Sequence, residues 1–217
     1  MEKRIITISR EFGSGGRELG KRLAEEMGFA YYDKEILSMI SERMQMDEGY
    51  IEKELNKSIT ISYPYTIRRS FYQTPSQVNQ VPKLLAEQNK IIRSLAEKED
   101  CVIVGRGADA ILREHDPFSL FIYADQEAKA ARCRSRAPED ERLSENELTR
   151  KMKQIDKSRA AAYALVSEHS WGDKKAYRLC INTSGIPIPQ IVPCLAELAK
   201  IWFERNKTDD SSIIGSF

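Results

Sequence analysis

Three glycines fall within four residues at positions 13 to 16, where a short apolar run gives way to a helical pattern. Glycine permits backbone conformations that turn amide N–H groups inward around an anion, and the N-terminus of the following helix adds partial positive charge. The stretch with this chemistry comprises Gly13, Ser14, Gly15, Gly16, Arg17 and Glu18. A plain strand-to-helix turn is the alternative, although it seldom needs so many glycines or flanking arginines. The sequence therefore favours a phosphate-binding loop.

This loop departs from the Walker pattern GxxxxGK[ST] at its charged positions. Arg10 stands where the first glycine belongs, and Gly16 stands where the lysine belongs. In that pattern the lysine reaches the terminal phosphates and the next hydroxyl binds Mg²⁺. Arg17 is the candidate replacement for the lysine, although a guanidinium fork differs from an ammonium point charge. The loop predicts phosphate binding, whereas turnover would depend on this replacement.

Two further charged residues follow short apolar runs. Asp33 comes after Phe29–Tyr32, and Arg106 comes after Cys101–Val104 with a glycine on each side. An arginine at the end of a strand can bind a phosphate through two parallel N–H bonds. A surface turn explains Gly-Arg-Gly equally well when this stretch is taken alone.

The helix expected over residues 125–136 carries Arg132 and Arg136, which lie four apart and share one face. Basic residues on a helix usually form a solvated face, and that is the alternative here. The polar residues 137–144 follow directly and are expected to form a loop. In phosphoryl transfer, mobile lids bring arginines over the transferring group and exclude water.

A second helix is expected over residues 145–166. Its apolar positions define an inward face, and Arg159 falls on that face with Asp156 three residues earlier. A basic residue facing inward beside a carboxylate is either a structural ion pair or a ligand clamp. Periodicity alone does not separate these two interpretations.

Five short apolar runs alternate with helical patterns along the chain. The expected strands are Ile5–Ile8, Phe29–Tyr32, Cys101–Val104, Phe118–Ala124 and Arg178–Asn182. This alternation predicts an α/β fold, with a five-stranded parallel sheet covered by helices on both faces. Ligands of such sheets bind outside the carboxyl ends of the strands. The glycine-rich loop, Asp33 and Arg106 all fall at these strand ends.

Residues 57–82 lack periodicity, which indicates a functional or mobile segment.

Composition limits the classes of function. Hydrophobic residues make up 41% of the 217 positions and the net charge is +1, so no overall field favours nucleic acid or a membrane. Of four cysteines, three lie in apolar patterns and are expected to be buried, while Cys133 lies among arginines that could lower its pKa. His115 and His169 are expected at the surface. With no signal peptide or long apolar run, we expect a cytoplasmic protein.

The motifs together resemble the cytidylate kinase-like family, a branch of the P-loop nucleoside monophosphate kinases. The segments that carry the resemblance are ITISREFGSGGRELGKRLAEEMGFAYYDKEIL, CVIVGRGADAIL, the Arg132–Arg136 cluster, IDKSRAAAY and YRLCINTS. It extends over about residues 4 to 200. It implies a three-layer P-loop kinase fold with a small lid, and transfer of the γ-phosphoryl group of ATP to a nucleoside monophosphate such as CMP or dCMP, with Mg²⁺.

The resemblance also implies roles for the candidate residues. Residues 13–18 would hold the ATP phosphates, and the residues acting on the transferring group would be Arg17, Arg132 and Arg136. The acceptor side would comprise Asp33, Arg106, Asp156 and Arg159, with no protein metal site expected. There are two rival hypotheses. One is a non-catalytic nucleotide-binding regulatory module, and the other is a kinase of another small phosphate-bearing acceptor.

The same resemblance sets the expected organisation of the chain. A single kinase-like domain would span residues 1–204, with an acceptor-binding insertion at about 45–100, a lid at about 133–147 and a flexible tail at 205–217. The expected partner is a small-molecule nucleotide, with a homo-oligomer as a further possibility.

Overall fold

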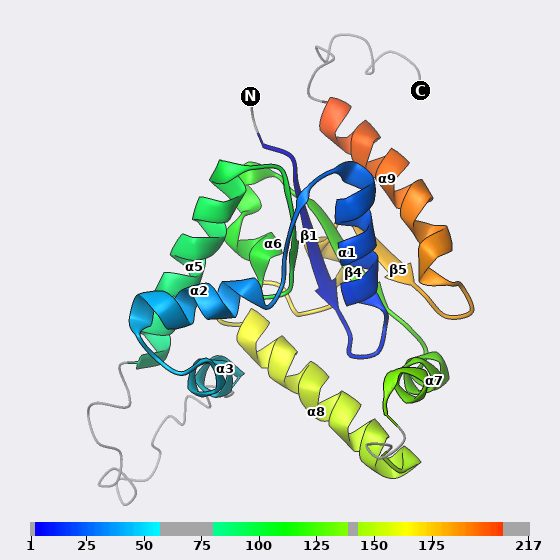
Figure 1. Ribbon diagram of the computed structural model, residues 1–217. Coiled ribbons are helices and arrows are strands. Elements are labelled where there is room, and N and C mark those ends of the chain that lie inside the picture. The colour runs from blue at the N-terminus through cyan, green and yellow to red at the C-terminus, as the bar shows by residue number, and fades with distance from the viewer. Residues whose placement is uncertain (1–2, 57–79, 139–142, 206–217) are drawn as a thin grey trace, which may run out of the picture.

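The computed structural model describes residues 3–56, 80–138 and 143–205 (Figure 1). Its centre is a five-stranded sheet in the order β2-β3-β1-β4-β5, with every described strand pair parallel. The strands are β1 (Ile5–Arg10), β2 (Ala30–Tyr32), β3 (Cys101–Val104), β4 (Phe118–Tyr123) and β5 (Leu179–Asn182). The α/β class and the parallel sheet predicted from the sequence are confirmed.

Successive side chains of the central strands enter two separate cores, because neighbouring strand residues point to opposite faces of a sheet. In β1, Ile5 belongs to one core, while Ile6 and Ile8 belong to the other. In β3, Ile103 lies on the first face and Val102 on the second. Burial on both faces explains the continuous apolar runs in the sequence.

One face of the sheet is covered by α1 (Gly16–Met27) and α9 (Ile188–Glu204). Leu19 and Leu23 of α1 are fully buried against the sheet. Gly20 lies beside them, and a Cβ atom there would come within 2.8 Å of Val104 Cγ2. The glycine therefore permits the close approach of α1 to β3.

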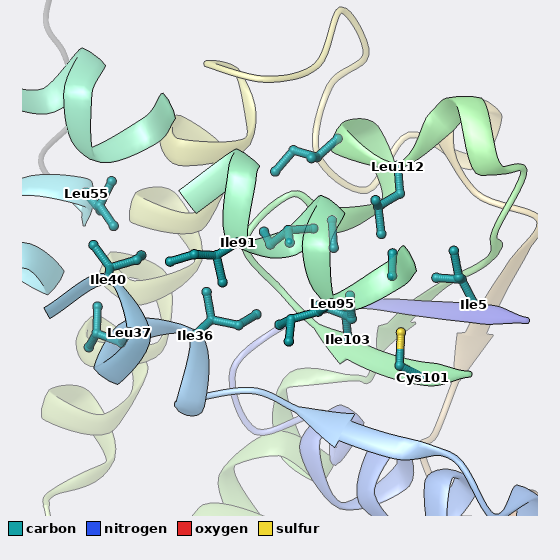
Figure 2. Close-up of a cluster of buried hydrophobic side chains, with 14 of the residues drawn as sticks. Ile5, Ile36, Leu37, Ile40, Leu55, Ile91, Leu95, Cys101, Ile103 and Leu112 are labelled. Atoms are coloured by element: carbon teal, nitrogen blue, oxygen red, sulfur yellow. The ribbon is translucent and has the colours of Figure 1, made fainter. Parts of the chain in front are cut away.

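The opposite face is covered mainly by α2 (Glu35–Met44), α5 (Gln80–Lys98) and the short α6 (Ala108–Ile111), with α3 (Glu48–Asn56) packed on the outside. Figure 2 shows how Ile36 and Ile40 of α2 meet Ile91 and Leu95 of α5 above the sheet residue Ile103. This core fixes the end of β2, and so it positions the residues that follow that strand.

The two remaining long helices lie at the carboxyl ends of the strands. These are α7 (Gln126–Arg136) and α8 (Glu145–Tyr163), and Figure 1 shows α8 beyond the arrowhead of β1. Ser144 begins α8 with a capping box, because its side chain accepts from the N–H of Glu147 and the Glu147 side chain accepts in return. Two short 3₁₀ helices, η2 (Arg113–His115) and η4 (Lys174–Ala176), complete the described elements.

Several details differ from the sequence expectations. Helix α8 ends at Tyr163 instead of continuing to Val166, since the backbone there tightens and the N–H of Val166 bonds the carbonyl of Tyr163 (3.0 Å). Among the cysteines only Cys101 is buried, and Cys194 is exposed because it lies on the outer side of α9. The two histidines are half-buried, not fully at the surface.

The expected segment 57–82, the centre of the expected lid and the expected tail lie largely outside the described residues. Within the described part, no helix combines the length and apolar character needed to span a membrane.

Candidate functional site

The glycine-rich loop joins β1 to α1 and needs its glycines for two reasons. Gly13 and Gly15 have φ values of 78° and 85°, in the left-handed region that other residues adopt at a cost. A Cβ atom on Gly15 would also lie 2.7 Å from Ile188 Cδ1. No side chain within the described ranges caps the first turn of α1. Its backbone N–H groups are therefore available to an anion at the mouth of the loop.

Hydrogen bonds from other elements hold the loop from behind. Thr183, just after β5, donates its hydroxyl to the carbonyl oxygen of Ser14 at 2.6 Å. Arg132 of α7 donates through Nη1 to the carbonyl of Gly13 (2.7 Å) and through Nη2 to that of Thr183 (3.3 Å). Arg132 thus braces the loop in this conformation, and its expected action on a transferring phosphoryl group stays a prediction.

A second set of contacts joins α7 to the start of α1. Arg136 forms an ion pair with Glu18, whose other oxygen accepts from Arg22 at 2.9 Å. Lys129 Nζ lies 2.8 Å from Glu11 Oε2, inside the loop. These pairs place α7 against the loop, so a movement of α7 would alter the loop's flanks.

Next to the loop lies a cleft of about 530 Å³ in which basic side chains outnumber acidic ones. Its arginines come from four separate elements and are Arg10, Arg17, Arg106 and Arg159. Asp33, which is 7% exposed, lies among them and is 2.5 Å from Arg17 Nε and 3.4 Å from Arg10 Nη2. Of the cleft residues predicted from sequence, Arg17, Asp33, Arg106 and Arg159 are brought together here.

Asp156 and Arg159 connect α8 to the loop. Asp156 Oδ1 accepts from the backbone N–H of Phe12 at 2.7 Å, and Arg159 Nη1 donates to the carbonyl of Arg10 at 3.0 Å. The two side chains are also an ion pair of 3.4 Å. Burial raises the pKa of Asp156, while the Phe12 N–H and Arg159 oppose that rise. The ion pair is therefore real, and it leaves Arg159 lining the cleft.

Arg106 occupies an unusual backbone conformation. It has a φ of 60°, between Gly105 at 82° and Gly107 at 66°. A left-handed arginine is uncommon and costs free energy, and such residues gather at ligand sites. The Gln88 side chain donates to its carbonyl at 3.3 Å, and burial lowers the pKa of the Arg106 guanidinium against the opposing effects of Glu52 and Asp33. The Gly105–Gly107 turn therefore places the Arg106 guanidinium in the cleft, and it is not an ordinary surface turn.

Arg10 also lines the cleft, although it was not among the site residues predicted from the sequence. Burial and the neighbouring charge of Arg159 together lower the pKa of its guanidinium to about 9, against the opposing effect of Asp33. The signal in the sequence was its position, at the first glycine of the Walker pattern. A cation held at such a place is stabilised by an anion, because several like charges crowd the same cleft.

The expectation for Cys133 was wrong. Burial against the loop raises the pKa of its thiol, and this effect exceeds the lowering by Arg136 and Arg132. Its Sγ atom instead fills space beside Gly13, where an added Cβ would lie 2.9 Å away. Cys133 is therefore a packing residue of the loop.

The residues present fit nucleotide phosphates better than they fit a metal. The loop offers amide N–H groups and the cleft offers guanidinium groups, which both bind phosphoryl oxygens. The described residues contain no cluster of three side chains able to hold a metal ion. Glu18, just beyond the lysine position, is already paired with Arg136. Enzymes of this chemistry commonly bind Mg²⁺ through the phosphates themselves with one or two carboxylates.

A parallel five-stranded sheet with a glycine-rich loop after its first strand, next to an arginine-lined cleft, defines a P-loop kinase fold. The model of the cytidylate kinase-like family matches residues 5–185, and the chain belongs to that family. The family and the fold together support a kinase-type phosphotransfer.

Solved structures agree with this fold. An uncharacterized protein from Eubacterium ventriosum is 27% identical, with a TM-score of 0.65, and the match covers 91% of this chain and 99% of that one. Shikimate kinase from Bacteroides thetaiotaomicron is 18% identical over 91% and 98% of the two chains, with a TM-score of 0.55. Shikimate kinase from Acinetobacter baumannii, in complex with shikimate, is 15% identical over 94% and 95%, with a TM-score of 0.52. The search of curated proteins returned no match.

Proposed function

We propose that the protein transfers the γ-phosphoryl group of ATP to a nucleoside monophosphate of the CMP or dCMP type. The observation that carries this proposal is the juxtaposition of two anion sites. The amide groups of the loop open beside a cleft in which Arg106, from the turn after β3, and Arg159, from α8, converge. One site suits donor phosphates, and the other suits the phosphate of an acceptor.

In this proposal the chain acts by positioning and by charge. The loop amides bind the donor phosphates, while Arg106 and Arg159 hold the acceptor phosphate in line with them. Asp33, at the end of β2, orients the acceptor and keeps the guanidinium groups of Arg10 and Arg17 in place. Mg²⁺ carried by the donor would neutralise part of its charge. No general base is needed, because positioning and electrostatics dominate this chemistry.

One observation favours a second candidate, a non-catalytic nucleotide-binding module. Gly16 is buried at the lysine position and leaves no charge there. Loss of a cation that stabilises the transition state typically costs a hundredfold or more in rate, about 3 kcal/mol. Such a module would bind nucleotide at the same cleft but would not turn it over.

A coupled assay with ATP, Mg²⁺ and each of CMP, dCMP, UMP and AMP separates these candidates. We expect turnover with CMP or dCMP, and a fall of roughly a hundredfold in Arg106→Ala because a transition-state contact is lost. Arg150→Ala, an exposed arginine of α8, is the matched control and should keep wild-type activity. Nucleotide binding without turnover on any acceptor would support the module instead, and turnover confined to another acceptor would identify a different kinase.

The remaining expectations belong with this function. A nucleotide kinase would have small molecules as its partners, not nucleic acid or membrane, and would work in the cytoplasm where ATP is available.

A further inference from the structure

Positions 10 and 16 are sterically linked across the loop. A Cβ atom built on Gly16 would lie 2.6 Å from the Cβ of Arg10 and 3.2 Å from the Cβ of Ile122. Cβ contacts below 3.0 Å are essentially never seen, and neither of these atoms is the end of a flexible side chain. A side chain at position 16, lysine included, would therefore force the backbone to shift for as long as residue 10 has a Cβ. Relative to the Walker pattern, the glycine and the long basic residue have exchanged places.

The Arg10 side chain starts from this shared space and runs into the cleft. A Cβ atom on Gly105 would overlap its Nη1, so the guanidinium lies directly over the backbone at the end of β3. Its Nη2 is 3.4 Å from Asp33 Oδ1, just beyond the end of β2. Arg10 thus spans the carboxyl ends of three strands from a start beside the first turn of α1.

A structural ion pair with Asp33 accounts for only part of this arrangement. Asp33 has a nearer partner in Arg17, at 2.5 Å. A guanidinium has five N–H donors, and the described contacts of the Arg10 side chain give it the single long bond to Asp33. The side chain is only 15% exposed and has three other arginines around it. Within the described residues, Asp33 therefore offsets only part of the positive charge in the cleft, and further N–H donors of Arg10 are open to an anion there.

We propose that Arg10 is a phosphate-binding residue that supplies, from the opposite side of the loop, the positive charge given by lysine in the Walker pattern. Its planar donors bind phosphoryl oxygens between the loop and the acceptor arginines. As a residue of phosphoryl transfer it depends on the proposed function, whereas its role as an anion ligand can be tested without turnover.

The test exchanges the residues at positions 10 and 16. Calorimetry measures how tightly each variant binds inorganic tripolyphosphate. We expect Arg10→Ala to weaken binding at least tenfold, and Gly16→Lys to give no gain because its Cβ has no room. The double variant Arg10→Gly with Gly16→Lys should recover binding to within about threefold of wild type, since a cation returns and the 2.6 Å clash with the Cβ of residue 10 is removed, which leaves the 3.2 Å approach to Ile122 Cβ. Arg10→Ala with Gly16→Lys is the matched control, because it keeps the clashing Cβ and should stay weak.

Two results would overturn the proposal. One is wild-type affinity in Arg10→Ala, and the other is a glycine–lysine double variant that binds no better than Arg10→Gly alone. Thermal unfolding of each variant shows whether it is folded, and Arg10→Lys provides a charge-preserving variant that should bind within tenfold of wild type. If the wild type binds tripolyphosphate but phosphorylates no acceptor, the proposed kinase function fails, while the binding series still decides the role of Arg10.

Discussion

At the scale of single residues, the site is a concentration of guanidinium groups around one buried carboxylate. Asp33 contacts both Arg10 and Arg17, and burial lowers the pKa of each of Arg10, Arg106 and Arg159. Each of these cations is costly to bury without an anion. The cleft is therefore set up to gain from the arrival of phosphate, and its affinity should depend strongly on every arginine.

The first prediction at this scale concerns Arg159. Arg159→Ala removes a cation that lines the cleft and leaves the Arg10 carbonyl without its donor. We expect CMP binding, measured by calorimetry, to weaken by at least tenfold, which is about 1.4 kcal/mol. Arg150→Ala on the exposed side of the same helix should bind as wild type does. Unchanged CMP binding in Arg159→Ala would mean that α8 does not contribute to the acceptor site.

The sequence predicted the placement of single residues where helical periodicity or a short motif sets the direction of the side chain. The position of Arg159 on the apolar face of its helix predicted its inward direction, and the glycines around Arg106 indicated its turn. Arg10 could not be selected in this way, because its Cβ takes the space that a side chain at position 16 would need, and this is apparent only in three dimensions. Cys133 shows the reverse error: its neighbours in sequence suggested a lowered pKa, but burial governs the thiol.

At the scale of elements, one buried carboxyl group ties together the parts that build the cleft. Asp109 of α6 accepts from the Ser9 hydroxyl at 3.2 Å and from the Tyr163 hydroxyl at 2.7 Å. Ser9 directly precedes Arg10 in β1, and Tyr163 is the last residue of α8. The relative placement of the loop, the Gly-Arg-Gly turn and α8 therefore depends on this small network.

Asp109→Asn is predicted to change how stability depends on pH. Burial raises the pKa of Asp109 in the folded protein above its ordinary value of 3.8. Its contribution to stability is then fully present below that value and is lost as the pH rises through the folded pKa. Asparagine cannot titrate, so the stability of the variant relative to wild type should improve from about pH 4 upward. Urea unfolding at several pH values measures this, with Asp116→Asn as an exposed control; parallel pH curves would contradict the prediction.

Element prediction succeeded for strands and was less accurate at helix ends. The apolar run Cys101–Val104 was located to the residue, because a central parallel strand is buried on both faces. The end of α8 was missed by three residues, since alanine and apolar side chains continue the helical pattern past Tyr163. The backbone tightens after Tyr163, where the N–H of Val166 bonds the carbonyl of Tyr163, and the local sequence pattern does not signal this change.

At the scale of the whole molecule, two cores on either side of the sheet hold the cleft in shape. The strand order β2-β3-β1-β4-β5 places β1 at the centre and brings the ends of β2 and β3 to one side of the loop. The sequence predicted a parallel sheet, but it did not contain this order, which arises from the crossovers between strands. The convergence of the predicted residues follows from that order.

The core beneath α5 gives a prediction for overall stability. Ile91 is 1% exposed and lies in the centre of the cluster in Figure 2. Ile91→Ala should lower the free energy of unfolding by about 2–5 kcal/mol through lost burial and a cavity. The melting temperature should fall by roughly 4–20 °C. Ile201→Ala, at a position 64% exposed on α9, is the matched control and should change it by only about 1–2 °C; equal shifts would mean that the two cores are not organised as described.

The steric link between Arg10 and Gly16 also has an evolutionary consequence. A loop of this kind cannot acquire a Walker lysine in one step, because lysine at position 16 meets the Cβ of any residue other than glycine at position 10. The reverse step, glycine at position 10 alone, leaves the loop with neither cation. Each single change is thus disfavoured. Only a paired change converts arginine at position 10 with glycine at position 16 into glycine at position 10 with lysine at position 16. Lineages with this loop would therefore keep it, and adapt their chemistry around an arginine instead of returning to the lysine.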